Sequence, residues 1–513
     1  MTADLLANKR KLGHLATTDA ASDTLPGVGA EQTFRLFING EWVEPSKGGY
    51  AVVNPATEAV VAEAPEAGVD QVNDAVDSAR AAFAGWSRTS PTDRAELLQR
   101  LADAFERRIP DLVPLVQAET GATMRVARTL QVTQCADRFR RYARLANENH
   151  DISLPPSVMP NTALAKGGLI GAVVARQPVG VVACITPYNF PLTNMAGKVA
   201  PALAMGNTVV VKPAPQDPLA VLKFAEAVEE SGLPPGVFNV VTGSGAEAGQ
   251  ALVEADIDMV SFTGSTPVGQ RIAETAGRGM KRLLLELGGK GAGVVFDDAD
   301  VAAAVAGIGS SWSFHSGQIC TAPTRVIAHR AVHDQLVEQL AAYAGYLKVG
   351  DPLSDDTIVG PVISGLQRDR VEALLDTGRQ DGAEFVVGGV RPDLERGYYV
   401  APTLLTGVKN EWRVAQEEFF GPVVVVETFD DEDEAVALAN GTPFGLYDYV
   451  WSGDSVRAYR VARQLRSGNV GINTVQRNHE APFGGFKLSG VGRDGGVFGL
   501  HAYSELQSIV FPS

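Results

Sequence analysis

The chain has 513 residues, of which 45% are hydrophobic and 20% charged, a balance typical of a globular protein. At about 150 residues per domain, this length predicts roughly three domains. Its 44 basic and 60 acidic residues give a net charge of -16, which argues against a general binder of nucleic-acid phosphates. The three cysteines exclude a disulfide scaffold and favour a reducing compartment. No stretch has the composition of a signal peptide or a membrane helix, so we expect a cytoplasmic protein.

The N-terminal part of the chain changes character after its first 33 residues. Residues 1–33 are polar and rich in small side chains, which predicts a flexible arm. Asn39 and Gly40 then predict the turn of a β-hairpin. The helical spacing of apolar residues predicts two helices after this hairpin, the first capped by Asp70 and the second starting near Thr92.

Short apolar strands alternate with helices through the middle third of the chain. This alternation is typical of a doubly wound parallel sheet that binds dinucleotides. The first of these helices is expected to have Asp217 as its cap and Gly232 at its end. A second alternation, from Val294 to about Val470, predicts another α/β domain. The strands of the first alternation are expected at Val179–Ile185, Thr208–Val211, Phe238–Val241, Met259–Phe262 and Leu283–Leu285, with helices at about 217–231, 245–254 and 266–277.

Cys320 and Glu286 are candidates for chemistry, and each has a structural alternative. Cys320 follows Gly317 in a polar loop, which indicates a cleft, but a lone cysteine is more often a small core residue. Glu286 ends an apolar strand and precedes two glycines, at the edge where open α/β sheets face their ligands. Burial there would raise its pKa and suit it to act as a general base. A helix cap or a salt bridge is the alternative for Glu286.

Asn189 and Lys212 also follow predicted strands. Asn189 is either a turn residue or an amide that stabilises an oxyanion. Lys212 either binds a ribose or phosphate or is a surface lysine with a packed stem. Cys135 and Cys184 are expected to be packing residues.

Two glycine-rich turns, which begin at Gly243 and Gly264, each connect a strand to a helix, where backbone N–H groups can face phosphate. The second has the glycine spacing of a P-loop but lacks the Lys and Ser/Thr that such a loop requires. His329 and His333 lack the glutamate and the third ligand of a zinc site, so we expect no metal.

Together these motifs resemble the aldehyde dehydrogenase superfamily, from about Phe37 to the C-terminus. The resemblance implies a Rossmann-like nucleotide-binding domain, an α/β catalytic domain and a small β oligomerisation element. It implies an enzyme that oxidises an aldehyde to a carboxylic acid with NAD, with NADP as the alternative cofactor. The resemblance rests on the order and spacing of Pro187–Pro191, Lys212-Pro213, Phe262–Ser265, Glu286–Lys290, Gly317–Cys320, Glu418–Pro422 and Pro482–Gly490.

The same resemblance implies the catalytic roles. Cys320 is the nucleophile that attacks the aldehyde, and Asn189 and the backbone N–H of Cys320 hold the oxyanion of the thiohemiacetal. Loss of hydride to the nicotinamide gives a thioester, which is hydrolysed by water that Glu286 activates. One alternative is an acyl-transferring relative that uses coenzyme A and commonly lacks this glutamate. A second is a non-catalytic binding or structural protein on the same fold.

The resemblance also implies the ligand contacts. Lys212 matches the lysine at the adenosine ribose, and Glu418 matches the carboxylate at the nicotinamide ribose. The implied cofactor contacts are Ile185, Thr186, Pro187, Lys212, Gly264, Ser265, Leu287, Glu418 and Phe420. The implied substrate pocket consists of Phe190, Asn194, Ile319, Thr321, Arg477 and Phe483.

Some positions depart from the family pattern. Pro215 stands where the family often has a glutamate that binds both adenosine ribose hydroxyls, which weakens the preference for NAD over NADP. Asn194 and Gly197 replace larger apolar groups, which predicts a roomier and more polar substrate entrance. Arg477, in the loop that borders this entrance, is either a solvated arginine or a partner for a substrate carboxylate.

We expect the dinucleotide-binding domain at residues 34–150 and 173–287, and the catalytic domain at 288–490. The oligomerisation element is expected at 151–172 and 491–513. Its last strand, Leu506–Phe511, would extend a partner's sheet as in this family, because an open edge needs covering. We therefore expect a homodimer or homotetramer that acts on a small-molecule aldehyde, without nucleic-acid or membrane partners. Fold and chemistry do not determine which aldehyde.

Overall fold

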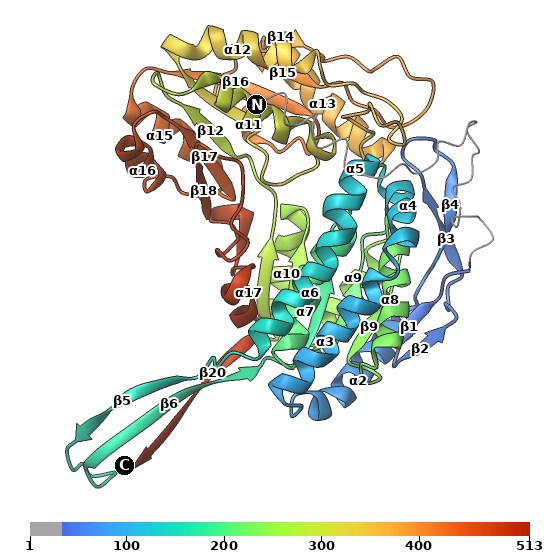
Figure 1. Cartoon of the computed structure of the whole chain (residues 1–513), viewed down its shortest axis with the longest axis vertical. Coiled ribbons are helices and arrows are strands. Elements are labelled where there is room, and N and C mark those ends of the chain that lie inside the picture. The colour runs from blue at the N-terminus through green and yellow to red at the C-terminus, as the bar shows by residue number, and fades with distance from the viewer. Residues whose placement is uncertain (1–32, 513) are drawn as a thin grey trace.

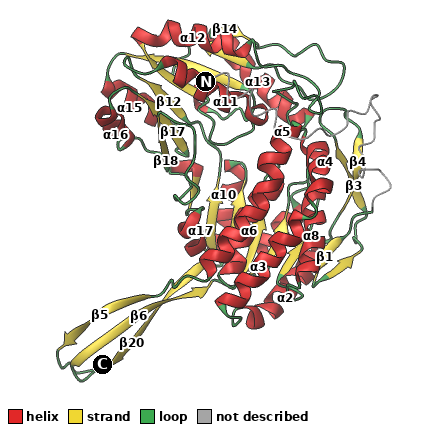
Figure 2. Ribbon diagram, viewed as in Figure 1, coloured by secondary structure: helices red, strands yellow, loops and turns green. Residues whose placement is uncertain are grey.

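The computed structural model describes residues 33–512, so the arm predicted at 1–33 lies almost entirely outside the described residues. Two α/β bodies, each built on its own sheet, lie one above the other in Figure 1. A three-stranded ribbon projects from the lower body (Figure 2). Within residues 33–512, no helix is both long and apolar enough to span a bilayer.

The lower body is built on a sheet of eight strands. Its central strands are parallel and nearly all buried, which confirms the predicted doubly wound sheet. Registers that pair Ile185 with Lys212 and Thr263 with Glu286 bring the carboxyl ends of these strands to one edge. The strand order is β19 (Gly490–Val491), β11 (Arg282–Glu286), β10 (Met259–Thr263), β7 (Val181–Ile185), β8 (Thr208–Lys212), β9 (Phe238–Val240), β1 (Leu36–Ile38) and β2 (Glu41–Val43).

Helices cover both faces of this sheet, because successive strand residues point to opposite sides. Val182 and Cys184 pack into the core on one face, and Val181 and Ala183 pack into the core on the other. The first face is covered by α3 (Pro91–Glu106), α4 (Ile109–Thr120), α6 (Thr133–Ala146), α7 (Pro191–Ala204) and α8 (Leu219–Ser231). The second is covered by α2 (Val69–Trp86), α9 (Glu247–Glu254) and α10 (Thr266–Arg278).

The hairpin turn and the end of α8 were predicted correctly, whereas two helix caps were not. The hairpin is confirmed, with Ile38 paired to Glu41 around the Asn39 turn. Gly232 ends α8 in the left-handed conformation, as predicted.

Both predicted caps are wrong. Gly68 is the N-cap of α2, and Asp70 lies inside its first turn. Asp217 does not cap α8, because the Glu119 carboxylate of α4 accepts the N–H groups of Leu219 and Ala220.

The upper body is built on a sheet of seven strands, parallel except for its edge strand β14. This sheet confirms the predicted second alternation. Its order is β14 (Glu384–Val387), β15 (Thr403–Thr406), β16 (Val423–Phe429), β13 (Arg325–His329), β12 (Ala292–Val295), β17 (Tyr447–Trp451) and β18 (Asn469–Ile472). The helices around it are α11 (Val301–Ser313), α12 (Arg330–Ala344), α13 (Gly365–Asp381), α15 (Glu432–Asn440) and α16 (Ser455–Ala462).

The projecting ribbon consists of β5 (Ile152–Met159), β6 (Gly168–Pro178) and the C-terminal β20 (Ser504–Pro512). β6 is the central strand, and β20 pairs with it over its whole length. The predicted strand at Leu506–Phe511 is confirmed within β20, and its side chains are largely exposed. The remaining elements are the hairpin β3 (Gly49–Val53) and β4 (Val60–Pro65) and the short α5 (Met124–Val126), η2 (Ala127–Val132), η3 (Phe314–Gly317), α14 (Arg413–Gln416), η4 (Lys487–Ser489) and α17 (Gly496–Ala502).

Candidate active site

Cys320 follows a sharply bent segment at the end of η3. His315, Ser316 and Gly317 have positive φ angles of 45°, 58° and 74°, a conformation that costs energy in non-glycine residues. A Cβ at Gly317 would collide with the carbonyl oxygen of Gly421, so only glycine fits. The bend leaves Cys320 partly exposed, whereas Cys135 and Cys184 are fully buried, which confirms them as packing residues.

Asn189 points at the loop that carries Cys320. Its Nδ2 donates to the carbonyl of Gln318 at 2.9 Å, and its Oδ1 accepts from Asn194 at 3.3 Å. The buried Gln131 donates to the Asn189 backbone carbonyl at 2.9 Å. Gln131 belongs to the π-helix η2, an element frequent at functional sites. The side-chain amide of Asn189 is therefore fixed beside Cys320 rather than used in its own turn.

Glu286 is buried at the carboxyl end of β11, and neither of its carboxylate oxygens has a hydrogen-bond partner. It is therefore neither a helix cap nor half of a salt bridge, the two structural alternatives. Burial raises its pKa well above the ordinary value, and the charge of Asp494 adds to the shift, while Lys198 and Arg477 oppose it. A buried carboxylate without a protein partner is ready to accept a proton.

Charges in this region also act on the cysteine. Burial, together with the charges of Glu418 and Glu286, raises the pKa of Cys320 to about 12. The Arg477 guanidinium acts in the opposite direction. Cys320 therefore rests as a thiol, and its nucleophilic attack requires a base.

The sheet edge offers groups that suit a dinucleotide. Lys212 is buried rather than on the surface, and its Nζ donates to the carbonyls of Pro213 at 3.0 Å and Gly243 at 3.4 Å. The Thr186 hydroxyl is buried without a partner at the end of β7. Ser265 is the N-cap residue of α10, but its hydroxyl accepts no hydrogen bond from the helix. The first N–H groups of α10 therefore have no acceptor from the capping side chain. The unpartnered Thr186 hydroxyl, the buried Lys212 and the open N-terminus of α10 are groups that suit the hydroxyls and phosphates of a dinucleotide.

The other expected cofactor positions lie around the same edge. Ile185 is buried as the last residue of β7, and Pro187 follows two residues later. The Leu287 N–H donates to the Ser489 carbonyl. The Gly264 N–H donates to the Glu286 carbonyl, which ties the glycine turn to the catalytic strand.

Glu418 and Phe420 reach the site from the upper body. Burial raises the pKa of Glu418 more than the hydrogen bond from the Gly289 N–H at 3.0 Å lowers it, which gives a pKa of about 7. Phe420 has a φ of 51° and packs edge-on against Tyr188, with ring centroids 5.7 Å apart. These contacts hold both residues at the junction of the two bodies.

Two of the expected substrate residues pack against aromatic side chains. Phe190 stacks on Phe314 with ring centroids 6.0 Å apart. The Thr321 carbonyl accepts from the Tyr449 hydroxyl, and Ile319 is half-buried next to the cysteine. Arg477 lies over the ring of Phe483 at 3.8 Å.

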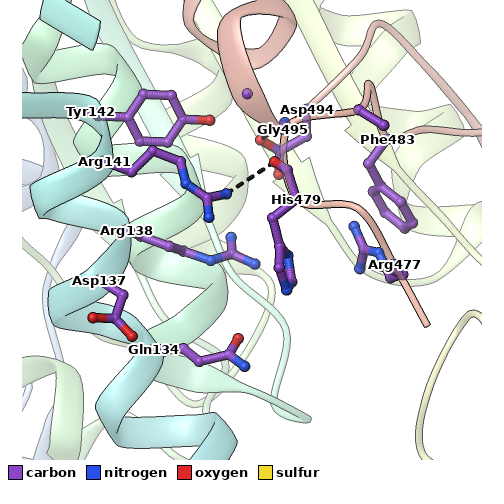
Figure 3. A pocket seen from close by; sticks show the side chains of 12 residues that line it. Gln134, Asp137, Arg138, Arg141, Tyr142, Arg477, His479, Phe483, Asp494 and Gly495 are labelled. Carbon is purple, nitrogen blue, oxygen red and sulfur yellow. Dashed lines mark hydrogen bonds between the residues drawn. The ribbon is translucent and has the colours of Figure 1, made fainter. Parts of the chain in front are cut away.

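Figure 3 shows the pocket that contains Arg477 and Phe483, a cavity of about 130 Å³. Its opposite wall is α6, which contributes residues that the sequence reasoning missed, Arg138 among them. Their signal was a series of arginines on this helix, at 138, 141 and 144. Two other residues were also missed because neither belongs to a recognisable motif. They are Gln131, which holds Asn189, and Glu66, whose charge acts on Lys212.

Comparison with known proteins agrees with this arrangement. A model of the aldehyde dehydrogenase family matches residues 42–509. Betaine aldehyde dehydrogenase of Bacillus subtilis is 37% identical, over 92% of this chain and 96% of that protein. The 3-succinoylsemialdehyde-pyridine dehydrogenase of a Pseudomonas species is 38% identical, over 93% of this chain and 98% of that protein.

Solved structures agree as well. Aldehyde dehydrogenase C of Pseudomonas syringae, a cysteine-to-alanine variant with NAD+ and octanal, has a TM-score of 0.87 at 41% identity, with 94% and 97% of the two chains covered. Betaine aldehyde dehydrogenase of Staphylococcus aureus with NAD+ has a TM-score of 0.89 at 35% identity, with 94% and 95% covered.

The chain belongs to the aldehyde dehydrogenase family, as the sequence motifs predicted. It is an enzyme that oxidises an aldehyde to a carboxylic acid with a nicotinamide cofactor.

Proposed function

We propose that Cys320, Asn189 and Glu286 carry out this oxidation with hydrolysis of an acyl-enzyme. The observation that carries the proposal is the buried Glu286 carboxylate, which has no partner among the described residues and whose charge acts on Cys320. A structural role would leave no reason to bury an unpaired carboxylate, because burial without a partner costs several kcal/mol, on the order of 2–7 for a neutral polar group and more for a charge.

The first step is attack of the Cys320 sulfur on the aldehyde carbon. The thiol loses its proton to solvent water as the S–C bond forms, so Glu286 stays ionised for the later hydrolysis. The Asn189 amide and the Cys320 backbone N–H stabilise the charge that develops on the aldehyde oxygen, each donor worth about 10²–10³ in rate. Gln131 keeps the Asn189 backbone in place through its 2.9 Å hydrogen bond.

The second step leaves a thioester on Cys320. When bound, the nicotinamide ring supplies the acceptor for the hydride that the thiohemiacetal carbon loses. Lys212, Thr186, Gly264, Ser265 and Glu418 are the residues that would hold this cofactor.

Hydrolysis of the thioester completes the cycle. Glu286 takes a proton from water as the water oxygen attacks the acyl carbon, and the Cys320 thiolate leaves. An acyl transfer to coenzyme A would not need this base, so the presence of Glu286 supports hydrolysis.

The cofactor is proposed to be NAD rather than NADP, although Pro215 lacks a side-chain acceptor. Glu66 supplies a carboxylate in the same region. Its Oε2 accepts the Ser244 N–H at 2.9 Å, and its charge acts on Lys212. A negative charge beside the adenosine ribose disfavours a 2′-phosphate. The ratio of kcat/KM for NAD to that for NADP measures this preference directly.

We also propose that the enzyme is a cytoplasmic homo-oligomer whose ribbon serves assembly. The exposed apolar side chains Leu506, Ile509, Val510 and Phe511 on β20 favour burial against a partner. The two buried free cysteines and the free Cys320 fit a reducing compartment. The proposed division keeps the expected catalytic domain at 288–490 and sets the nucleotide-binding domain at 34–150 and 179–287, but the ribbon runs over 152–178 and 504–512, because β5, β6 and β20 have these bounds. Residues 491–503 join the lower body, since α17 packs against α6 and α7.

The test of the reaction is the formation of reduced nicotinamide from an aliphatic aldehyde and NAD. Cys320→Ala is expected to abolish it, and Cys135→Ala, which removes a buried packing sulfur, is expected to leave it within about threefold of wild type. Normal turnover by Cys320→Ala would contradict the proposal.

A further inference from the structure

The pocket between α6 and the loop before Phe483 is lined by three arginines, by His479 and by the carboxylates of Asp137 and Asp494 (Figure 3). Arg138 and Arg141 come from α6, and Arg477 and His479 come from the loop. Arg141 is already engaged, because it donates to the His479 carbonyl at 2.9 Å and lies 3.3 Å from the Glu480 carboxylate. Arg138 and Arg477, by contrast, form no hydrogen bond or ion pair within residues 33–512.

The position of Arg138 depends on a glycine in the facing helix α7. A Cβ at Gly197 would collide with Nη1 of Arg138, so the missing side chain makes the space in which the guanidinium lies. The Asp494 carboxylate is near the same point without forming an ion pair with Arg138. The Arg138 guanidinium therefore occupies the space that the sequence predicted beside Gly197.

The Arg477 guanidinium lies close enough to the catalytic cysteine for its charge to act on it. It is held over the Phe483 ring at 3.8 Å, and its charge lowers the pKa values of both Cys320 and Glu286. Desolvation and the charge of Arg138 lower the pKa of Arg477 itself, so the two guanidinium groups repel each other. An anion between them would relieve this repulsion and satisfy both sets of donors.

We propose that the substrate is an aldehyde with a carboxylate at its other end, and that Arg138 and Arg477 bind this carboxylate. This inference rests on the proposed function, since the aldehyde carbon must lie at Cys320. A planar carboxylate matches the forked donors of guanidinium groups. The cavity of about 130 Å³ has room for such a group.

The same charges act against other substrates. A quaternary ammonium aldehyde, the substrate class in the name of the Bacillus subtilis relative, would meet two unpaired cations in this pocket. An unsubstituted alkanal would leave both guanidinium groups without a partner. The pocket therefore discriminates by attraction of one class and repulsion of another.

The experiment compares matched aldehydes with the full-length enzyme and NAD. Succinate semialdehyde is paired with butanal, glutarate semialdehyde with pentanal, and betaine aldehyde is the cationic probe. We expect kcat/KM for the carboxylated member of each pair to exceed that of its alkanal by at least about tenfold, with betaine aldehyde the poorest substrate. Hydrogen bonds to charged groups are worth about 1.5–3 kcal/mol, which sets a scale of about 10- to 100-fold.

Three variants assign the effect to the pocket. Arg138→Ala and Arg477→Ala should each lower the ratio of kcat/KM for a carboxylated aldehyde to kcat/KM for its paired alkanal by about 10- to 100-fold, mainly through KM for the carboxylated member. Gly197→Ala keeps all charges but displaces the Arg138 guanidinium, so it should lower the same selectivity. Arg144→Ala, on the same helix but outside the pocket, should change nothing.

The outcomes separate the two levels of the claim. If wild type oxidises alkanals as well as or better than carboxylated aldehydes, the carboxylate site is wrong and the proposed reaction stands. Equal losses for both members of a pair in Arg138→Ala and Arg477→Ala would also overturn the site, because they would indicate a structural role. If no aldehyde reduces NAD in a Cys320-dependent way, the proposed function itself is wrong.

Discussion

At the scale of single residues, the site is defined by polar groups that the protein buries and leaves unpaired. Glu286 and the Thr186 hydroxyl are buried and lack protein partners. Unpaired buried polar groups are costly and therefore uncommon. In the proposed function, water completes the hydrogen bonds of Glu286 and the cofactor completes that of Thr186.

The raised pKa of Glu286 predicts an acid limb in the pH profile of turnover. The base must be deprotonated, so kcat falls as pH falls through this pKa, which lies well above the ordinary 4.5. Asp494→Asn removes the neighbouring negative charge that raises this pKa, so the limb should move to lower pH. Steady-state kinetics across pH would check this. An unmoved limb in Asp494→Asn would assign the titration to another group.

Strand ends and glycine-rich turns marked Cys320, Glu286 and Asn189 as candidates, and the family resemblance then implied their catalytic roles. Sequence reasoning could not choose between roles for Glu286 and Lys212, because that choice depends on burial and partners. Gln131 was missed because its partner, the Asn189 carbonyl, is 58 residues away in the chain. Arg138 was missed because its position depends on Gly197 in the facing helix.

At the scale of elements, the segment before Cys320 positions the nucleophile by strain. Three successive residues adopt positive φ angles, and Ser316 Oγ donates to the Gly360 carbonyl at 2.8 Å. The Gln318 side chain accepts the Ile363 N–H at 2.9 Å, which ties the loop to a second segment. These contacts hold a conformation that the chain would not adopt alone.

Gly317→Ala should disrupt this element. Its φ is 74°, and the added Cβ would collide with the Gly421 carbonyl oxygen, so we expect at least about a tenfold loss of kcat/KM and a loss of stability of about 1–3 kcal/mol. Gly382→Ala is the matched control, with a φ of 93° and no atom within 4 Å. It should lose stability by about 1 kcal/mol, with activity unchanged. Equal activity in both variants would show that the bend does not position Cys320.

Helix caps explain why local sequence rules failed at some element ends. Asp217 precedes a proline and a helical pattern, which is the usual signature of a cap. The helix start is instead bound by Glu119, about 100 residues earlier in the chain. The strands were predicted to within about two residues because their apolar runs are bounded by turns, and no distant residue changes that pattern.

At the scale of the whole molecule, two α/β bodies meet so that Cys320 and Glu418 of one face the strand ends of the other. The order of apolar strands and helices predicted both bodies, because parallel sheets require this alternation. The contacts between the bodies could not be predicted, since they depend on loop conformations such as that of Phe420.

The buried pair Glu119 and Asp217 should make global stability depend on pH. Burial raises the pKa of Glu119 to about 8 and that of Asp217 well above its ordinary value. The folded state then holds more protons than the unfolded chain, so the free energy of unfolding falls as pH rises from about 4 toward 8. Asp217→Asn should flatten this slope, by up to about 1.4 kcal/mol per pH unit for one proton. Urea unfolding at pH 5 and pH 8 would measure it, and an unchanged slope would mean that Asp217 does not titrate in this range.

The central claim is that Cys320 forms an acyl-enzyme that Glu286 hydrolyses, and one measurement tests it most directly. Glu286→Gln is mixed with aldehyde and NAD, and reduced nicotinamide and intact protein mass are followed together. We predict a burst of one reduced cofactor per active site, slow turnover afterwards, and a protein mass raised by the acyl group on the Cys320 peptide. A wild-type steady-state rate without any acyl adduct would contradict the account.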